Sequence, residues 1–255
     1  MRKKRHKHDV ETRSIASLQI RDMISKHLKT IFIIFIIPII LISKPLVFSM
    51  EFYLIEDDTT SPVMTYDMSV EKIEGINDTA LLMFTEPTAY VKRHSDHYSK
   101  EFRKARDLYE TFPNSASLQH HFYYETGDIL FSNRRFYSLR QHKSWYTGGA
   151  HPNSLSTHWI VKKSNGKTLN FRDIFKDGSD DKLKTLLDKH LLKQFNIKSL
   201  TDVLFSEEYP VSRDIYLVKK GIVFQYDPYE IAPYSTGPIE IFLPYRKIHK
   251  FLKDF

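Results

Sequence analysis

A single apolar run near the N-terminus constrains this chain more than any other feature. Residues 31–42 read IFIIFIIPIILI, with Arg21, Lys26 and Lys29 before the run and Ser43-Lys44-Pro45 after it. A bilayer-spanning helix needs about 20 apolar residues, whereas the core of a signal peptide needs about 7 to 15. No other segment resembles this run. We therefore expect the chain to be exported, so that the part after the run is periplasmic or extracytoplasmic.

The sequence leaves the fate of this N-terminal segment, residues 1–49, open between two interpretations. If translation starts at Met23, MISKHLKT is an ordinary basic leader, and cleavage after Val47-Phe48-Ser49 would free Met50 onward. If Met1 is the start, MRKKRHKH is a cytoplasmic tail, and residues 31–48 act as an uncleaved anchor in the inner membrane.

The net charge of +7 belongs entirely to that segment. Residues 1–49 hold ten Lys and Arg against three Asp and Glu, which leaves 28 basic and 28 acidic residues in the remainder. Because the exported part is neutral, we expect no nucleic acid among its partners. Cysteine is absent, which excludes disulfides, thiol catalysis and Cys-ligated metals, and suits an oxidising exterior.

The remainder divides into a linker at 50–65 and two small subdomains at 66–130 and 131–255. Apolar and β-branched runs predict strands, and two pairs of runs predict early hairpins: 69–76 with 80–85, and 118–124 with 128–132. The Asn165-Gly166 pair predicts a third hairpin between 157–162 and 168–171. Three further strands are expected at 214–218, 221–226 and 239–243.

Two helices are predicted between these strands, and a short one is expected to close the chain at 245–252. Residues 95–112 place Tyr98, Phe102, Ala105 and Tyr109 on one stripe. Residues 179–195 place Leu183, Leu186, Leu187, His190 and Leu191 on one face, with Ser179 as the expected N-cap. The fold class is therefore α+β, with a largely antiparallel sheet packed against helices.

No motif for catalysis is visible, so we expect no enzyme activity, no catalytic residues and no cofactor. The chain lacks a Gly-x-Ser-x-Gly elbow, a phosphate-binding glycine loop and a His-Glu-x-x-His pair. The pairs His94/His97 and His120/His121 have no carboxylate at zinc-like spacing. We interpret them as partly exposed polar positions and expect no metal.

The candidate binding residues lie in two loops. The first, YTGGAHPN at 146–153, combines paired glycines with a histidine and a proline, and the second, within 221–238, concentrates tyrosines and prolines. Tyrosine offers rigid amphipathic contact area, although a purely structural turn explains the same composition. The candidate residues are Tyr146, Gly148, Gly149, His151, Asn153, Tyr229, Glu230 and Tyr234.

A resemblance to a known family rests on the order and spacing of four strings. They are YTGGAHPN at 146–153, NGKTLNFRDIF at 165–175, GIVFQYDPYEIAPYSTGP at 221–238 and the late IFLPYRKI. Over about residues 130–255 the chain resembles the RsiV-like C-terminal domain family, named from an anti-sigma factor that acts as a lysozyme receptor. Residues 66–130 resemble more weakly the small domain associated with a peptidoglycan deacetylase.

The resemblance implies a curved antiparallel sheet and binding without catalysis. The leading hypothesis is an exported binding domain of the cell envelope that recognises a protein such as lysozyme or a cell-wall component such as peptidoglycan. One alternative is a membrane-anchored signalling receptor of the anti-sigma type, for which residues 1–28 would have to bind a sigma factor. Another alternative is an accessory to a peptidoglycan-modifying enzyme.

Overall fold

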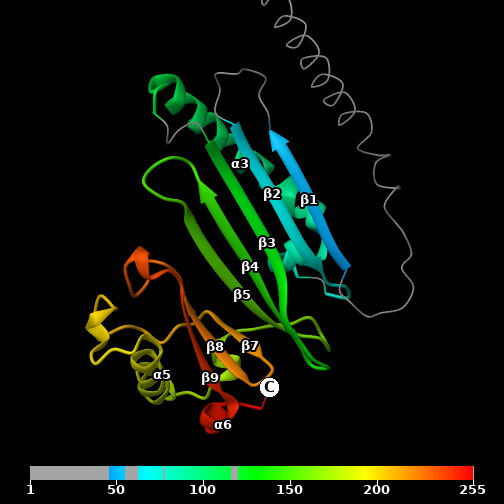
Figure 1. The fold of residues 1–255 in the computed structure, drawn as a ribbon. Helices are drawn as coiled ribbons and strands as arrows, with labels where there is room; N and C mark the ends of the chain where they lie inside the picture. The colour runs from blue at the N-terminus through cyan, green and yellow to red at the C-terminus, as the bar shows by residue number, and fades with distance from the viewer. Residues whose placement is uncertain (1–45, 55–62, 77, 116–119, 255) are drawn as a thin grey trace, which may run out of the picture. The chain divides into compact units, whose positions relative to one another are not determined.

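The computed structural model describes residues 46–54, 63–76, 78–115 and 120–254 (Figure 1). The α+β class with mostly antiparallel sheet is confirmed. A six-stranded sheet has the order β1-β2-β3-β4-β5-β6, and a three-stranded sheet has the order β7-β8-β9. The strands are β1 (Leu46–Leu54), β2 (Val63–Lys72), β3 (His120–Ser132), β4 (Phe136–Tyr146), β5 (Asn153–Lys162), β6 (Thr168–Leu169), β7 (Ile215–Val218), β8 (Gly221–Tyr226) and β9 (Ile239–Pro244).

Helices and single turns connect these strands. The α-helices are α2 (Leu82–Thr85), α3 (Pro87–Thr111), α4 (Phe171–Ile174), α5 (Asp180–Phe195) and α6 (Tyr245–Ile248). The 3-10 turns are η2 (Thr79–Leu81), η4 (Leu200–Asp202), η5 (Tyr234–Thr236) and η6 (His249–Phe251). The predicted helices at 95–112 and 179–195 are thus confirmed, and the expected C-terminal helix is α6 followed by η6.

Both early hairpins were wrong. Residues 80–85 are helical rather than extended, since a short apolar run does not distinguish the two states and the Asp78 side chain caps the turn at the Ala80 N–H. Residues 120–124 and 128–132 do not pair with each other, because both belong to the single strand β3, which forms its hairpin with β4. β3 pairs parallel with β2, and the helix α3 provides the long crossover that a parallel pair needs.

Gly127 lies in the middle of β3, between the two runs that were expected to pair. A Cβ at this position would lie 2.5 Å from the Val70 side chain on the neighbouring strand. The glycine is therefore required by the close approach of β2 to β3, not by a change of chain direction.

The strand β1 was also unexpected, because residues 50–54 had been assigned to a linker. It pairs antiparallel with β2 along its whole length, from Leu46 opposite Lys72 to Leu54 opposite Met64. The apolar run at 31–42 lies outside the described residues. Among the residues that are described, no helix combines the length and the apolar character needed to cross a membrane.

The region before β4 packs α2 and α3 onto one face of the six-stranded sheet, and Figure 1 shows α3 behind that sheet. Its core includes Tyr66, Met68, Phe84, Tyr90 and Tyr98. His121 is also buried there, so the expectation of a partly exposed histidine was wrong at that position. In β3, His121 lies on the same face of the sheet as Glu125, and α3 covers that face.

A second, larger core holds α5 against β7–β9, and the predicted leucine face of α5 is confirmed. Leu183, Leu187 and Leu191 are fully buried. Ser179 precedes the helix as predicted, but its hydroxyl donates to the Lys176 carbonyl rather than capping the helix. The boundary expected at 130/131 falls inside β3, and the sheet continues across it.

The two ends of the six-stranded sheet are distinct. At what we call the entry end, β1 begins at Leu46, β2 ends at Lys72 and the β3–β4 turn is made. At the loop end, β1 ends at Leu54, and Trp145 of β4 pairs with Asn153 of β5 across the β4–β5 loop. The nine residues of β1 separate the two ends by about 30 Å.

Candidate functional site

The two loops singled out in the sequence meet at the loop end. The β4–β5 loop covers residues 147–152, and the β8–β9 loop covers residues 227–238. The His151 ring stacks on the Tyr234 ring with 3.7 Å between centroids and 16° between planes. The Tyr234 hydroxyl donates to the Pro152 carbonyl at 2.7 Å. Contacts between rings and backbone thus hold one loop against the other.

His151 connects three groups of this cluster. Its Nδ1 lies 2.9 Å from the Pro152 carbonyl, which can only accept, so Nδ1 carries the proton in this contact. In the neutral ring Nε2 is then an acceptor, and it lies 3.2 Å from the Tyr229 hydroxyl. We call His151, Tyr229 and Tyr234 the aromatic cluster.

Tyr229 has the most unusual conformation in the cluster. Its φ is +70°, in the left-handed region that a bulky residue avoids, and 56% of its surface is exposed. Two hydrogen bonds close the turn around it: the Asp227 N–H donates to Glu230 Oε2 at 2.9 Å, and the Glu230 N–H donates to the Asp227 carbonyl at 3.0 Å. The turn therefore presents an aromatic ring to solvent at a conformational cost of about 1 to 3 kcal/mol.

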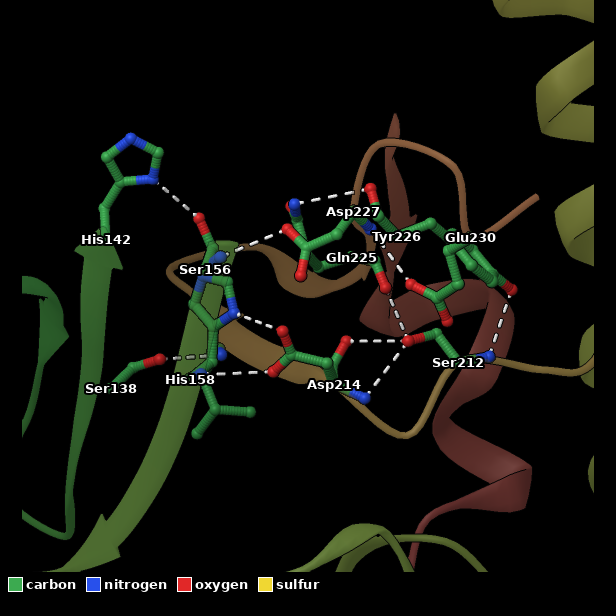
Figure 2. Close-up of polar contacts among 11 residues, drawn as sticks. Ser138, His142, Ser156, His158, Ser212, Asp214, Gln225, Tyr226, Asp227 and Glu230 are labelled. Carbon is green, nitrogen blue, oxygen red and sulfur yellow. Dashed lines mark hydrogen bonds and ion pairs between the residues drawn. The ribbon is translucent and has the colours of Figure 1, made fainter. Parts of the chain in front are cut away.

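Two carboxylates that flank strands of the second sheet, Asp214 before β7 and Asp227 after β8, bind the edge of β5 (Figure 2). Asp227 Oδ1 accepts the Ser156 N–H at 3.1 Å, and Asp214 Oδ1 accepts the His158 N–H at 3.1 Å. Asp214 Oδ2 also lies 2.9 Å from His158 Nδ1. The two carboxylates thus satisfy edge donors of β5 that a neighbouring strand would otherwise bind.

The electrostatics of this attachment follow from partial burial. Burial raises the pKa of Asp227, and the nearby Asp214 carboxylate raises it further, while the Ser156 N–H opposes the shift. Burial likewise raises the pKa of Glu230. Burial lowers the pKa of His142, whose Nδ1 lies 3.0 Å from the Ser156 hydroxyl.

Most of the residues predicted from sequence come together here. The Tyr146 hydroxyl donates to the Gly149 carbonyl at 2.8 Å, and Gly148 and Gly149 have φ values of +95° and +103°. Glu230 serves the turn rather than facing outward, through its bond to the Asp227 N–H. Asn153 is the exposed first residue of β5.

Sequence reasoning missed Asp214, Asp227, Ser156 and His158. Each lies near a strand end or within a strand. A polar residue at such a position usually indicates only that the position is exposed to solvent. The one available signal is that Asp227 opens the proline- and tyrosine-rich loop directly after an apolar strand. Within the described ranges, no group of three or more His, Asp or Glu side chains is arranged to hold a metal ion.

Two solved structures share this fold. A member of the DUF3298 family from Bacteroides fragilis NCTC 9343 matches with a TM-score of 0.68 and 21% identity, over 82% of this chain and 94% of that one. A DUF3298 family protein from Pseudomonas aeruginosa PAO1 matches with a TM-score of 0.56 and 18% identity, over 82% and 95%. At these identities the likeness establishes the fold alone.

Two family models match consecutive parts of the chain. The model "Deacetylase PdaC" matches residues 56–154, and "Protein of unknown function (DUF3298)" matches residues 172–246. The chain is therefore similar to the PdaC model over residues 56–154 and to the DUF3298 model over residues 172–246, the latter within the region that resembles the RsiV-like family. No curated protein matches the chain. The β4–β5 loop belongs to the first matched region and the β8–β9 loop to the second, so both regions contribute to the aromatic cluster.

Proposed function

We propose that this chain is an exported binding domain of the cell envelope, and that the aromatic cluster is its recognition surface. The observation that carries the proposal is Tyr229, which is held by hydrogen bonds in a left-handed conformation and is still largely exposed. An exposed ring in a strained conformation does not stabilise the core. In a binding surface, the same ring supplies contact area that is already ordered before the ligand binds.

The place of the cluster supports this role. It lies at the loop end, about 30 Å of sheet away from Leu46, where the chain enters the fold after the apolar run. In a chain held at a membrane by residues 31–42, a site that is distant from Leu46 leaves room for ligands outside.

The strand β1 favours an uncleaved anchor over a signal peptide removed before Met50. Cleavage after Ser49 would remove Leu46 to Ser49, which pair with four residues of β2 from Ser69 to Lys72. We therefore propose that the segment around residues 31–42 stays attached and holds the domain at the outer face of the inner membrane.

Two ligand classes are proposed. The RsiV-like resemblance supports a protein such as lysozyme, and the match to a model named for a deacetylase supports a cell-wall component such as peptidoglycan. The proposed role is recognition without bond chemistry. A release of acetate or of wall fragments from sacculi treated with the purified chain would contradict that part of the proposal.

The test is capture of lysozyme and of isolated peptidoglycan sacculi by the full chain. We expect Tyr229→Ala and Tyr234→Ala to weaken capture more than tenfold, as for the central residues of other interfaces. Phe112→Ala is the matched control, because Phe112 is 58% exposed but lies at the end of α3. Unchanged capture by both tyrosine variants, or no capture of either ligand by the wild type, would refute the proposal.

A further inference from the structure

The charged residues of the connecting segments are sorted between the two ends of the six-stranded sheet. At the loop end, the β4–β5 and β8–β9 loops contain two acidic residues, Asp227 and Glu230, and no Lys or Arg. At the entry end, the β3–β4, β5–β6 and β7–β8 turns contain six Lys and Arg and no acidic residue. The six are Arg134, Arg135, Lys163, Lys167, Lys219 and Lys220.

These turns lie together although they are distant in sequence. A cavity lined by Asn133, Arg135, Leu217 and Tyr245 joins the β3–β4 turn to β7 and to the C-terminal segment. The Tyr245 N–H donates to the Lys220 carbonyl, which places α6 beside the β7–β8 turn. α6 and η6 add three more cations and no anion: Arg246, Lys247 and Lys250.

Several of these positive charges have no acidic side chain paired with them in the described part of the chain. Arg134, Lys219 and Lys220 are exposed, and none of them forms an ion pair with another residue of the described part of the chain. The acidic groups closest to the turns are partly engaged, since Asp173 pairs with Lys167 at 3.1 Å and Asp78 accepts the Thr168 hydroxyl. Glu74 and Asp254 offset two charges, so the entry end remains strongly positive.

The chain enters the fold at this same end. Leu46 begins β1 only four residues after Ile42, the last residue of the apolar run. Four residues span at most about 14 Å, so a run that lies in a membrane keeps the entry end close to the headgroups. This step rests on the proposed anchoring, but it does not depend on the proposed ligands.

We propose that the entry end is a docking surface for anionic phospholipid headgroups, which orients the domain with the aromatic cluster away from the bilayer. The argument is charge complementarity at the one end that the anchor holds near the lipid. Each Lys or Arg near an anionic membrane surface strengthens association about fivefold. The β4–β5 and β8–β9 loops carry no Lys or Arg that could bind the membrane in this way.

The absence of cysteine makes the orientation measurable. Ser164→Cys introduces one donor-dye site in the β5–β6 turn, and Ser235→Cys introduces one in η5 at the loop end. The full chain is reconstituted in vesicles that carry an acceptor dye on the headgroups, made either of phosphatidylcholine alone or with phosphatidylglycerol. Energy transfer is then compared between the two sites and the two lipid compositions.

We expect stronger transfer from position 164 than from position 235, and we expect anionic lipid to increase the difference. High salt should remove that increase, because it screens exposed charges. The variant Arg134→Gln/Lys219→Gln/Lys220→Gln should reduce the docked population roughly 100-fold. The control Lys92→Gln/Lys100→Gln/Arg103→Gln removes three exposed cations from α3 and should have no effect.

Three results would overturn the proposal. Equal transfer in neutral and anionic vesicles would mean that the tether alone sets the orientation. Capture of a soluble polyanion such as polyphosphate, with no response to lipid charge, would assign the cations to a different partner. Failure of the chain to float with any vesicle would refute both the anchoring and the docking, and it would leave capture of lysozyme or sacculi as a separate question.

Discussion

The molecule contains two tyrosine clusters that have opposite physical character. Near α3, Tyr90 and Tyr98 donate hydrogen bonds to the carboxylate of Glu125, which is 1% exposed and also accepts a bond from Gln141 at 2.9 Å. At the loop end, Tyr229 and Tyr234 contact His151, and Tyr229 is exposed while Tyr234 is half-buried. The same residue type thus fastens a helix in one place and forms a surface in the other.

The difference lies in where the hydroxyl groups point. Burial and the neighbouring Glu125 carboxylate raise the pKa of Tyr90 and of Tyr98, so both stay protonated and donate. Lys143 lies 3.7 Å from the same carboxylate and balances its charge. In the aromatic cluster, the Tyr234 hydroxyl only orders a loop, and its loss exposes no buried charge. The partners of the hydroxyl groups therefore distinguish the two kinds of cluster. Hydroxyls that donate to a buried charge support the fold, and hydroxyls that donate to exposed backbone leave the rings available as a surface.

The largest effect should come from removing the centre of the buried cluster. Glu125→Ala leaves two tyrosine hydroxyls and the Gln141 amide without their acceptor, and each such bond to a charged group contributes about 1.5 to 3 kcal/mol. We expect the free energy of unfolding to fall by about 3 kcal/mol or more, measured by urea denaturation. Glu125→Gln, which keeps a carbonyl acceptor, should lose less, and equal losses for both variants would contradict this account.

Removing one tyrosine hydroxyl from each cluster tests the difference between the two clusters directly. Tyr98→Phe deprives a buried carboxylate of a donor and should cost about 1.5 to 3 kcal/mol. Tyr234→Phe removes a bond to an exposed backbone carbonyl and should cost less than about 1 kcal/mol. Melting curves of the two variants measure the difference, and similar losses would show that the two clusters are not distinct.

The smallest effect on stability should come from Tyr229. Glycine adopts positive φ without strain, so Tyr229→Gly should leave stability within about 1 kcal/mol of the wild type, in the stabilising direction. The same variant should lose ligand capture. A destabilisation of more than about 2 kcal/mol in urea denaturation would mean that the Tyr229 ring supports the fold.

Sequence patterns predicted the second half of the chain better than the first. The Asn165-Gly166 turn is confirmed, with Gly166 at a φ of +71°, and the predicted strand at 221–226 is β8. These elements carry strong local signals, namely a turn that needs positive φ and a continuous run of apolar residues. In the first half, residues 80–85 and β3 were misassigned because their patterns fit more than one state until the parallel pairing of β2 with β3 is known.

The sequence by itself determined the α+β class, the leucine face of α5 and the identity of the two loops, since each depends on residues close together in the chain. Its candidate residues included Tyr229 and not Tyr226, and Tyr229 is exposed while Tyr226 is fully buried. Only the tertiary structure decided that the two loops touch, that Asp227 binds the edge of β5 and that Glu125 is buried. Those contacts join residues from 16 to 82 positions apart. The physical reason is that chain packing, rather than local preference, brings such partners within hydrogen-bond distance.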